Sequence, residues 1–306
     1  MRNIIAIDLG SNSIRALKID CKTKYTISSF HKTVRTADNL ANTGEISRGA
    51  LDRILKALDE INKKMDFSNS TIKAVTTEAL RQASNSKEIL DEIESKTGVI
   101  FNIINGDDEA KYALIATKYR LEKLNLNIDR FLLADIGGAS TELIFNYRDR
   151  FFSKSFPIGI VTLTQRYNNI EELEQNISDI MSDVKEFANE IYKTYGYVDE
   201  FIAIAGTPTT LASLKLGLTY STYDATKIHG TILTKEDLDI QLNNLLNMSK
   251  REREEAIGVG REDLIASGIV IYRELYNICN FNSSIVIDDG IREGLALSEC
   301  AKLSKR

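Results

Sequence analysis

A strand-and-turn pattern that occurs twice constrains the fold of this chain more than any other feature. The first copy, IAIDLGSNS, spans residues 5–13, and the second copy, LLADIGGAST, spans residues 132–141. Each apolar run leads to an aspartate and then to a turn of small residues, and an offset of 127 positions aligns Asp135 with Asp8. Two copies at matching places predict a duplicated domain whose halves hold a ligand from both sides.

Strand patterns alternate with helix patterns in both halves of the chain. Apolar strand runs at residues 72–76 and 201–204 are each followed by a helix pattern, and residues 170–195 read as one long helix. Ser47 is a suitable N-cap for the amphipathic helix expected over residues 47–64. This alternation predicts layered α/β domains. We place the domain boundary in the polar stretch 123–129, and no low-complexity linker separates the halves.

Composition and charge exclude several classes of protein. The 306 residues are 43% hydrophobic and 27% charged, which is typical of a globular protein with a sizeable core. No apolar stretch reaches the roughly 20 residues of a membrane helix, and no signal-peptide layout opens the chain. The net charge of −5 disfavours a nucleic-acid partner. We therefore expect a cytoplasmic protein without a membrane or nucleic-acid partner.

The three cysteines carry no recognisable spacing. Cys21, Cys279 and Cys300 lie far apart, without a CxxC or Cys/His pattern. The sequence therefore predicts three ordinary thiols in a reducing compartment, with neither a disulfide framework nor a zinc site.

The two turns have the chemistry of phosphate-binding loops. Small side chains let several backbone N–H groups converge on one anion. An aspartate beside bound phosphate is repelled unless a cation lies between them, and Mg²⁺ binds through one or two carboxylates plus substrate phosphates. Neither a GxxxxGK[ST] loop nor a Rossmann GxGxxG spacing is present. A single copy of such a turn would equally fit an ordinary hairpin.

Further segments occur in an order that matches a known family. They are TEALRQA, INGDDEAKYA, PIGIVTLTQ, IAGTPTTLA, KIHGTIL, VGREDLIASGI and DDGIREGL. With both turns, they make the chain resemble the short form of the exopolyphosphatase / guanosine pentaphosphate phosphohydrolase (Ppx/GppA) family, within the actin-like and hexokinase superfamily. The resemblance implies two duplicated actin-like (ribonuclease H-like) α/β domains with an interdomain cleft. It places them at residues 1–124 and 125–306, with a terminal helix at about 293–306 that packs back on the first domain.

The resemblance also implies roles for individual residues. Glu109 matches the family's catalytic glutamate, Glu142 a catalytic or metal-linked glutamate, and Arg81 an arginine near the phosphates. Asp135, Glu142 and Asp8 would hold the metal. Without the family, Asp107, Asp108 and Glu109 are indistinguishable acids in the first turn of a helix. The implied phosphate-binding residues are Gly10, Ser11, Asn12, Ser13, Gly137, Gly138, Ala139, Ser140, Gly206 and Thr207.

The remaining candidate site residues are weaker, and one position departs from the usual sequence of the family. Arg15, Lys18, Arg261 and Arg292 are weaker basic candidates, for which a solvated surface role is at least as good an interpretation, and His229 better fits a structural hydrogen bond. Ala139 stands where the family usually has a third glycine. If that position needs a positive φ, alanine costs about 1 kcal/mol, and its methyl would crowd the phosphate.

The resulting hypothesis is a Mg²⁺-dependent phosphohydrolase, with Mn²⁺ as the alternative metal. Its substrate would be inorganic polyphosphate, with guanosine pentaphosphate as a second substrate or as the main one. Two other functions stay open: a sugar or acetate kinase of the same superfamily, and a non-catalytic sensor of guanosine penta/tetraphosphate. A homodimer is expected by resemblance alone.

Overall fold

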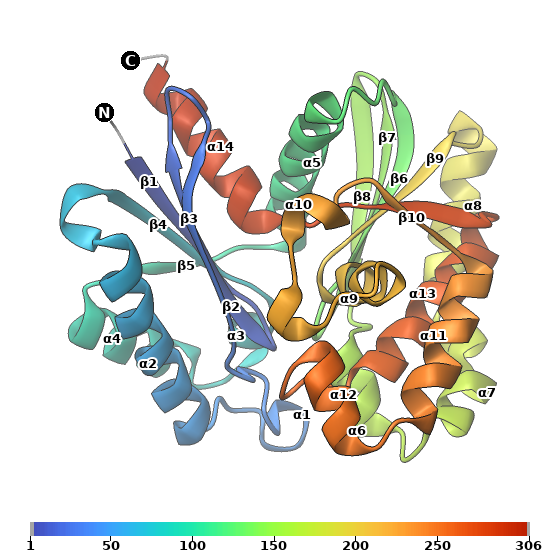
Figure 1. The fold of residues 1–306 in the computed structure, drawn as a ribbon, viewed down its shortest axis with the longest axis horizontal. Helices are drawn as coiled ribbons and strands as arrows, with labels where there is room; N and C mark the ends of the chain where they lie inside the picture. The colour runs from blue at the N-terminus through green and yellow to red at the C-terminus, as the bar shows by residue number, and fades with distance from the viewer. Residues whose placement is uncertain (1–2, 305–306) are drawn as a thin grey trace. The chain divides into compact units, whose positions relative to one another are not determined.

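The structure is a computed structural model, and it describes residues 3–304. The chain forms two compact units. The first combines the chain up to Thr117 with the segment from Asp289 onward, and the second spans Lys118–Asp288. Each unit is a β-sheet with helices packed against it (Figure 1).

The sheet of the first unit has five described strands. Its order is β3 (Thr26–Thr33), β2 (Ser13–Asp20), β1 (Asn3–Leu9), β4 (Thr71–Thr76) and β5 (Phe101–Ile103). β1 pairs antiparallel with β2 and parallel with β4. β1 is central, and its residues Ile4–Ile7 are fully or almost fully buried, as an unbroken apolar run predicts for an interior strand.

The sheet of the second unit repeats this topology with one more strand. Its order is β10 (Thr231–Thr234), β11 (Ser283–Val286), β9 (Glu200–Ile204), β6 (Arg130–Ile136), β7 (Thr141–Tyr147) and β8 (Arg150–Phe156). β6 pairs antiparallel with β7 and parallel with β9, as β1 does with β2 and β4. The duplicated α/β fold that the repeated turn predicts is therefore confirmed.

The helices of the first unit cover its sheet. They are α1 (Leu40–Thr43), α2 (Arg48–Met65), α3 (Glu78–Gln82), α4 (Ser86–Thr97), α5 (Gly106–Lys123), whose last residues belong to the second unit, and α14 (Ile291–Ser304). The Ser47 hydroxyl accepts a hydrogen bond from the Ala50 amide, which confirms the predicted N-cap of α2. α14 packs on β1 and β2. Gly294 lets α14 also pack closely on α5, because a Cβ there would overlap the Tyr112 backbone.

The helices of the second unit surround its sheet. They are α6 (Ile160–Arg166), α7 (Ile170–Ile180), α8 (Ser182–Tyr195), α9 (Gly206–Lys215), α10 (Ala225–Ile228), α11 (Lys235–Asn247), α12 (Lys250–Ile257) and α13 (Ile265–Cys279). The single helix expected over residues 170–195 is wrong, because the helix breaks at Met181, where φ is −94° and ψ is 16°. Met181 is fully buried, so the break lies inside the unit and not at its surface.

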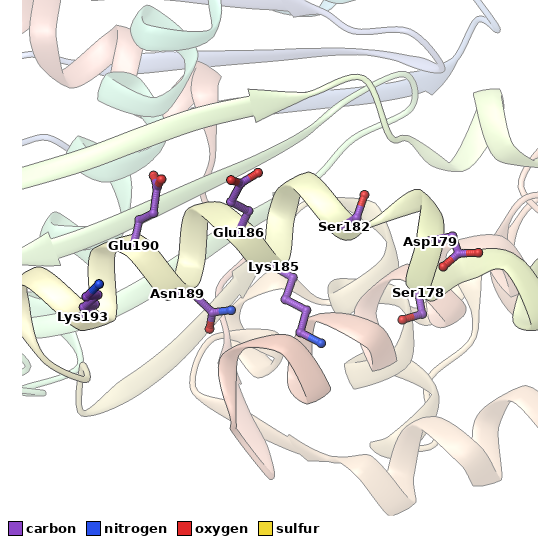
Figure 2. Close-up of a pocket in the computed structure, with 8 residues that line it drawn as sticks. All are labelled: Ser178, Asp179, Ser182, Lys185, Glu186, Asn189, Glu190 and Lys193. Carbon is purple, nitrogen blue, oxygen red and sulfur yellow. The ribbon is translucent and has the colours of Figure 1, made fainter.

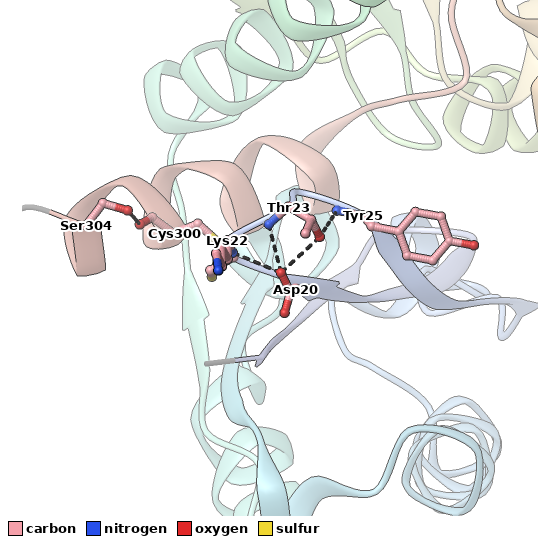
Figure 3. Close-up of a disulfide and its surroundings, with 7 residues drawn as sticks. Asp20, Lys22, Thr23, Tyr25, Cys300 and Ser304 are labelled. Carbon is pink, nitrogen blue, oxygen red and sulfur yellow. Dashed lines mark hydrogen bonds between the residues drawn. A yellow bond between two sulfur atoms is a disulfide. The ribbon is translucent and has the colours of Figure 1, made fainter. Parts of the chain in front are cut away.

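The expectation of three ordinary thiols is also wrong. Cys21, in the hairpin between β2 and β3, forms a disulfide with Cys300 of α14, and their Cα atoms are 5.0 Å apart (Figure 3). The hairpin is held locally by Asp20, whose carboxylate accepts hydrogen bonds from the amides of Lys22 and Thr23. The spacing of the cysteines does not indicate this pairing, because Cys21 and Cys300 meet only where α14 returns to the sheet in which the chain began. Cys279 is a buried free thiol, and burial raises its pKa to about 12.

No helix within residues 3–304 combines the length and the apolar character needed to cross a bilayer.

Candidate functional site

The first predicted phosphate loop is a tight hairpin turn between β1 and β2. The Gly10 amide donates to the Ser13 carbonyl at 2.9 Å, which closes the turn. The amides of Val34 and Arg35 bond the Asn12 carbonyl at 2.9 and 2.8 Å, and the Ala37 amide bonds that of Ser11 at 2.8 Å. The chain that follows β3 therefore occupies the carbonyl side of the turn.

The second predicted loop is built in the same way between β6 and β7. The Gly137 amide donates to the Ser140 carbonyl at 2.9 Å, the counterpart of the bond that closes the first turn. The amides of Ile160 and Val161, in the first turn of α6, bond the carbonyls of Gly137 and Gly138 at 3.1 and 2.7 Å. α6 therefore fixes the carbonyl side of this turn.

Both turns contain backbone N–H groups without a protein hydrogen bond among the described residues. Within the described part of the chain, no protein hydrogen bond uses the amides of Ser11, Asn12, Gly138 or Ala139. A turn whose carbonyls are bonded and whose amides are not presents positive dipoles to an anion. Ser11 and Ser140 are small residues, and each is only 5% exposed.

Ala139 does not have the backbone conformation that would strain an alanine. Among residues 3–304 the non-glycine residues with positive φ do not include Ala139. Its side chain is buried, and the strand-to-helix residue Gly159 packs directly on its backbone: a Cβ on Gly159 would lie 2.5 Å from the Ala139 Cα. The close approach is accommodated by the absence of a side chain at Gly159, and the conformational cost considered for Ala139 does not arise.

The aspartate at each turn faces a different partner in the two sheets. In the β6–β7 ladder Asp135 lies directly opposite Glu142, whereas in the β1–β2 ladder Asp8 lies directly opposite Arg15. Directly opposite residues of an antiparallel pair project from the same face, with Cβ atoms about 5 Å apart. The second unit therefore has two acids side by side, while the first unit has an acid beside a base.

The neighbouring strand orients Glu142. Ser155 of β8 is the cross-strand partner of Glu142, and its hydroxyl donates a 2.6 Å hydrogen bond to Glu142 Oε1. Glu142 is only 3% exposed. Two buried or half-buried carboxylates at one point repel each other, so this pair suits a divalent cation.

The donor set fits Mg²⁺ better than a metal held by protein alone. Within the described residues, no cluster of three or more Asp, Glu, His and Cys side chains that could hold a metal ion is present. Mg²⁺ is characteristically bound by one or two carboxylates, with water and substrate phosphates completing its coordination. Asp135 and Glu142 match that pattern.

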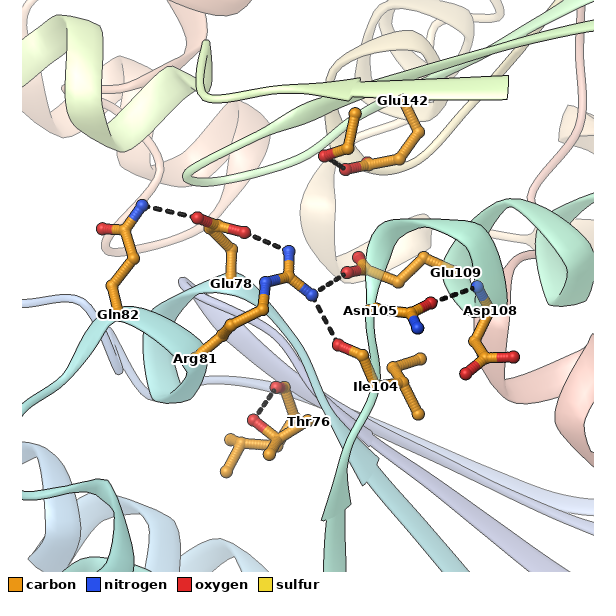
Figure 4. Close-up of polar contacts among 11 residues, drawn as sticks. Thr76, Glu78, Arg81, Gln82, Ile104, Asn105, Asp108, Glu109 and Glu142 are labelled. Carbon is orange, nitrogen blue, oxygen red and sulfur yellow. Dashed lines mark hydrogen bonds and ion pairs between the residues drawn. The ribbon is translucent and has the colours of Figure 1, made fainter. Parts of the chain in front are cut away.

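Glu109 is distinguished from its neighbours by its surroundings. It lies in the first turn of α5 and is 4% exposed, whereas Asp107 is exposed. Glu109 Oε1 accepts a 2.9 Å hydrogen bond from Arg81 Nη1, and the same nitrogen donates to the Ile104 carbonyl (Figure 4). The other terminal nitrogen of Arg81 bonds Glu78.

The charge of Arg81 is shared between two carboxylates. Burial disfavours its charged form, but the hydrogen bonds and charges of Glu109 and Glu78 outweigh burial and raise its pKa. The same contacts hold the buried Glu109 carboxylate against the Arg81 guanidinium.

The start of α9 supplies the third glycine turn. Gly206 is the first residue of this helix. Thr207 is fully buried, and its hydroxyl faces Gly268 of α13, where an added Cβ would lie 2.2 Å away, so its side chain packs inside the unit. Arg261 Nη2 donates 2.7 Å hydrogen bonds to the Gly206 carbonyl and to the Thr210 hydroxyl.

The weaker basic candidates and the histidine have structural partners. Lys18 donates to the Met65 carbonyl, and Arg292 pairs with Glu293. His229 Nδ1 accepts a 3.2 Å hydrogen bond from the Asp288 amide, in line with the structural role expected for it.

Sequence reasoning missed Glu78 and Ser155. Glu78 precedes Arg81 by three positions in a helix, a spacing that favours an ion pair and was present in the sequence. The position of Ser155 follows from the short turn between β7 and β8, because Tyr147 pairs with Arg150 and the register counts back from there to Glu142 and Ser155.

A groove elsewhere in the second unit contains none of the predicted site residues. It has a volume of about 560 Å³ and runs along α7 and α8, between Ser178 and Lys193 (Figure 2). Its lining side chains are polar and carry both signs of charge. Nothing in this groove resembles the chemistry of the two turns.

Known proteins are similar to this chain over nearly its whole length. Exopolyphosphatase 2 of Mycobacterium tuberculosis (strain CDC 1551 / Oshkosh) is 26% identical, over 97% of this chain and 98% of its own length. Guanosine-5'-triphosphate,3'-diphosphate pyrophosphatase of Aeromonas salmonicida is 25% identical over 95% of this chain, which spans only 58% of that relative.

Solved structures agree with this relationship. The Ppx/GppA family member of Aquifex aeolicus is 29% identical, with a TM-score of 0.74 over 99% of this chain and 98% of its own. An exopolyphosphatase from Cytophaga hutchinsonii has a TM-score of 0.86 over 98% of each chain at 21% identity, a likeness of fold alone. The expected pair of actin-like α/β domains is confirmed by these structures. Because the model of the Ppx/GppA phosphatase family matches residues 17–303, the chain belongs to that family.

Proposed function

We propose that this protein is an exopolyphosphatase, a metal-dependent hydrolase that removes the terminal phosphate of inorganic polyphosphate and releases orthophosphate. The observation that carries the proposal is the pair of matched turns. Each presents unbonded backbone amides to an anion, and the second places Asp135 directly opposite Glu142. Two phosphate-binding turns in one chain suit a substrate that is itself a row of phosphates.

The backbone of the two turns and of the start of α9 would bind the phosphate oxygens. The binding groups are those of Gly10, Ser11, Asn12 and Ser13 in the first unit, and of Gly137, Gly138, Ala139, Ser140, Gly206 and Thr207 in the second. Backbone amides recognise phosphate without reading a base or a sugar, which suits a polymer with no other feature.

Asp135 and Glu142 would hold Mg²⁺, or Mn²⁺ in its place, and Asp8 would serve as a further carboxylate for the metal. When bound, the cation neutralises the oxygens of the reacting phosphoryl group. Ser155 keeps one Glu142 oxygen hydrogen-bonded, which fixes the orientation of that carboxylate.

Glu109 would orient the attacking water and accept its proton, with Arg81 holding the carboxylate in place. In phosphoryl transfer most of the catalysis is positioning and charge stabilisation, so a carboxylate held in a fixed position is sufficient. Water attacks the terminal phosphorus in line with the bridging oxygen. The bond from phosphorus to that oxygen breaks, and the shortened polyphosphate leaves as an anion.

The comparisons favour polyphosphate over guanosine pentaphosphate as the main substrate. The chain aligns with 98% of a relative named exopolyphosphatase, but with only 58% of one named for guanosine-5'-triphosphate,3'-diphosphate. Both substrates end in a phosphoanhydride, so guanosine pentaphosphate is proposed as a second substrate that is converted to the tetraphosphate.

Location and assembly belong to the same proposal. We place the enzyme in the cytoplasm, as a homodimer, with neither nucleic acid nor a membrane as partner. The Cys21–Cys300 disulfide is the one observation that argues for an oxidising compartment, because stable disulfides are uncommon in reducing ones. A count of free thiols in protein taken directly from cells decides between the two.

The decisive experiment compares orthophosphate release from polyphosphate and from guanosine pentaphosphate, each with Mg²⁺ and with EDTA. We expect release that requires the metal, and a loss of about 10³-fold in kcat for Glu109→Gln. Asp107→Asn is the matched control, because it removes an exposed acid from the same helical turn. If guanosine pentaphosphate binds but neither substrate releases phosphate, the protein is a sensor instead.

A further inference from the structure

The Arg81 guanidinium lies between two carboxylates. Nη1 donates to Glu109, and Nη2 donates to Glu78 from the first turn of α3 (Figure 4). The side chain of Glu78 is 15% exposed and that of Glu109 5%, while Arg81 is 27% exposed. One cation therefore serves two acids in a partly desolvated place.

Glu78 is itself anchored on its other side. Gln82 Nε2, one helical turn later, donates a hydrogen bond to Glu78 Oε1, while Oε2 accepts from Arg81. Both Glu78 oxygens thus have donors, and the carboxylate is fixed from two directions. α3 has only five residues, so these side-chain hydrogen bonds, rather than a long helix, set the direction of Arg81.

The position of the guanidinium determines that of Glu109. A guanidinium is planar and its donors form a rigid fork, so fixing one terminal nitrogen fixes the other. Nη2 is held by Glu78, and the remaining anchor of Nη1 is the Ile104 carbonyl. Without Glu78, Arg81 would keep its attraction to Glu109 but lose the contact that sets its plane.

We infer that Glu78 is a positioning residue, which holds the Arg81 guanidinium against Glu109 and so orients the carboxylate that acts on the attacking water. The inference rests on the proposed function of Glu109. It also changes the role expected for Arg81: the arginine supports the carboxylate within its own unit, in addition to any contact with phosphate.

The test is a double-mutant cycle measured as orthophosphate release from polyphosphate with Mg²⁺. Glu78→Gln keeps the size of the side chain and removes its charge. We expect kcat to fall about 10-fold to 100-fold while KM changes less than about two-fold, because positioning is lost but binding is not. In an Arg81→Gln background the same Glu78→Gln change is expected to alter kcat less than about two-fold, because the partner is already gone.

Glu88→Gln is the matched control, since it removes one negative charge from the exposed first turn of the next helix, α4. Its kcat should equal that of the parent. Glu78→Asp, which keeps the charge on a shorter side chain, should retain more activity than Glu78→Gln, and it replaces that variant in the cycle if Glu78→Gln does not fold.

The possible results distinguish a failure of the role inferred for Glu78 from a failure of the proposed function. A parent that releases phosphate, with a Glu78→Gln variant of equal kcat, overturns the inference alone. An equal loss in the wild-type and Arg81→Gln backgrounds also overturns it, because Glu78 would then act independently of Arg81. A parent with no phosphate release on either substrate overturns the proposed function, and the inference with it.

Discussion

Ala205 has a backbone conformation that alanine rarely adopts. It precedes α9 with φ at 74° and ψ at −167°, a region occupied almost only by glycine. The strain there costs about 1–3 kcal/mol, whereas glycine loses about 0.5–1 kcal/mol through its more flexible unfolded chain. We therefore expect Ala205→Gly to stabilise the protein by about 1 kcal/mol, measured by urea unfolding.

A control within the same helix tests that explanation. Ala212 lies inside α9 and is fully buried, so Ala212→Gly should destabilise by about 1 kcal/mol or more, as glycine does in a helix interior. If both glycine variants destabilise the protein equally, Ala205 is not strained and the prediction is wrong.

The acids of α5 show what single residues reveal before a structure is known. Asp107, Asp108 and Glu109 follow one another in the sequence, and their residue types alone do not rank them. The fold separates them, because only Glu109 turns toward Arg81 and becomes buried. The direction in which a helix packs is a tertiary property, so the role proposed for Glu109 came from family resemblance and not from its residue type.

At the scale of elements, a row across three strands supports the candidate metal site. Asp135 of β6, Glu142 of β7 and Ser155 of β8 are successive cross-strand partners. The Ser155 hydroxyl bonds a buried carboxylate at 2.6 Å, and a hydrogen bond to a charged group contributes about 1.5–3 kcal/mol. We expect Ser155→Ala to lower the free energy of unfolding by about 1–2 kcal/mol at neutral pH in the absence of metal.

Ser153→Ala is the control for this row. Ser153 lies two residues earlier on β8, opposite Ile144, and makes no side-chain hydrogen bond within residues 3–304. Its replacement should change the free energy of unfolding by less than about 0.5 kcal/mol. A Ser155→Ala variant as stable as Ser153→Ala would show that the hydroxyl does not support Glu142.

Short turns made the strand register predictable, whereas long-range packing did not. The turn that closes on Gly137 and Ser140 fixes the β6–β7 register, so the pairing of Asp135 with Glu142 could be counted from the sequence. The break between α7 and α8 could not be predicted, because buried Ile177 and Val184 keep helical spacing on either side of it. A continuous apolar stripe does not show where the backbone bends under it.

At the scale of the whole chain, the Cys21–Cys300 disulfide joins positions that are 279 residues apart. The bond attaches α14 to the β2–β3 hairpin, and Cys300 is only 2% exposed. No spacing rule identifies such a pair, since the two cysteines meet only because the last helix returns to the sheet of the first unit. The fold class could be predicted from local repeats, but this closure depends on the complete topology.

A cross-link over so long a loop removes conformational freedom chiefly from the unfolded chain. We expect reduction by dithiothreitol to lower the free energy of unfolding by about 2–4 kcal/mol, seen as a lower melting temperature. Cys21→Ser should melt at that lower temperature with or without the reductant. Cys279→Ser should keep the response to the reductant, because its buried thiol lies outside the bond. Equal melting of the parent in both conditions, or alkylation of Cys21 without reductant, would contradict a stabilising disulfide and would favour a reducing compartment.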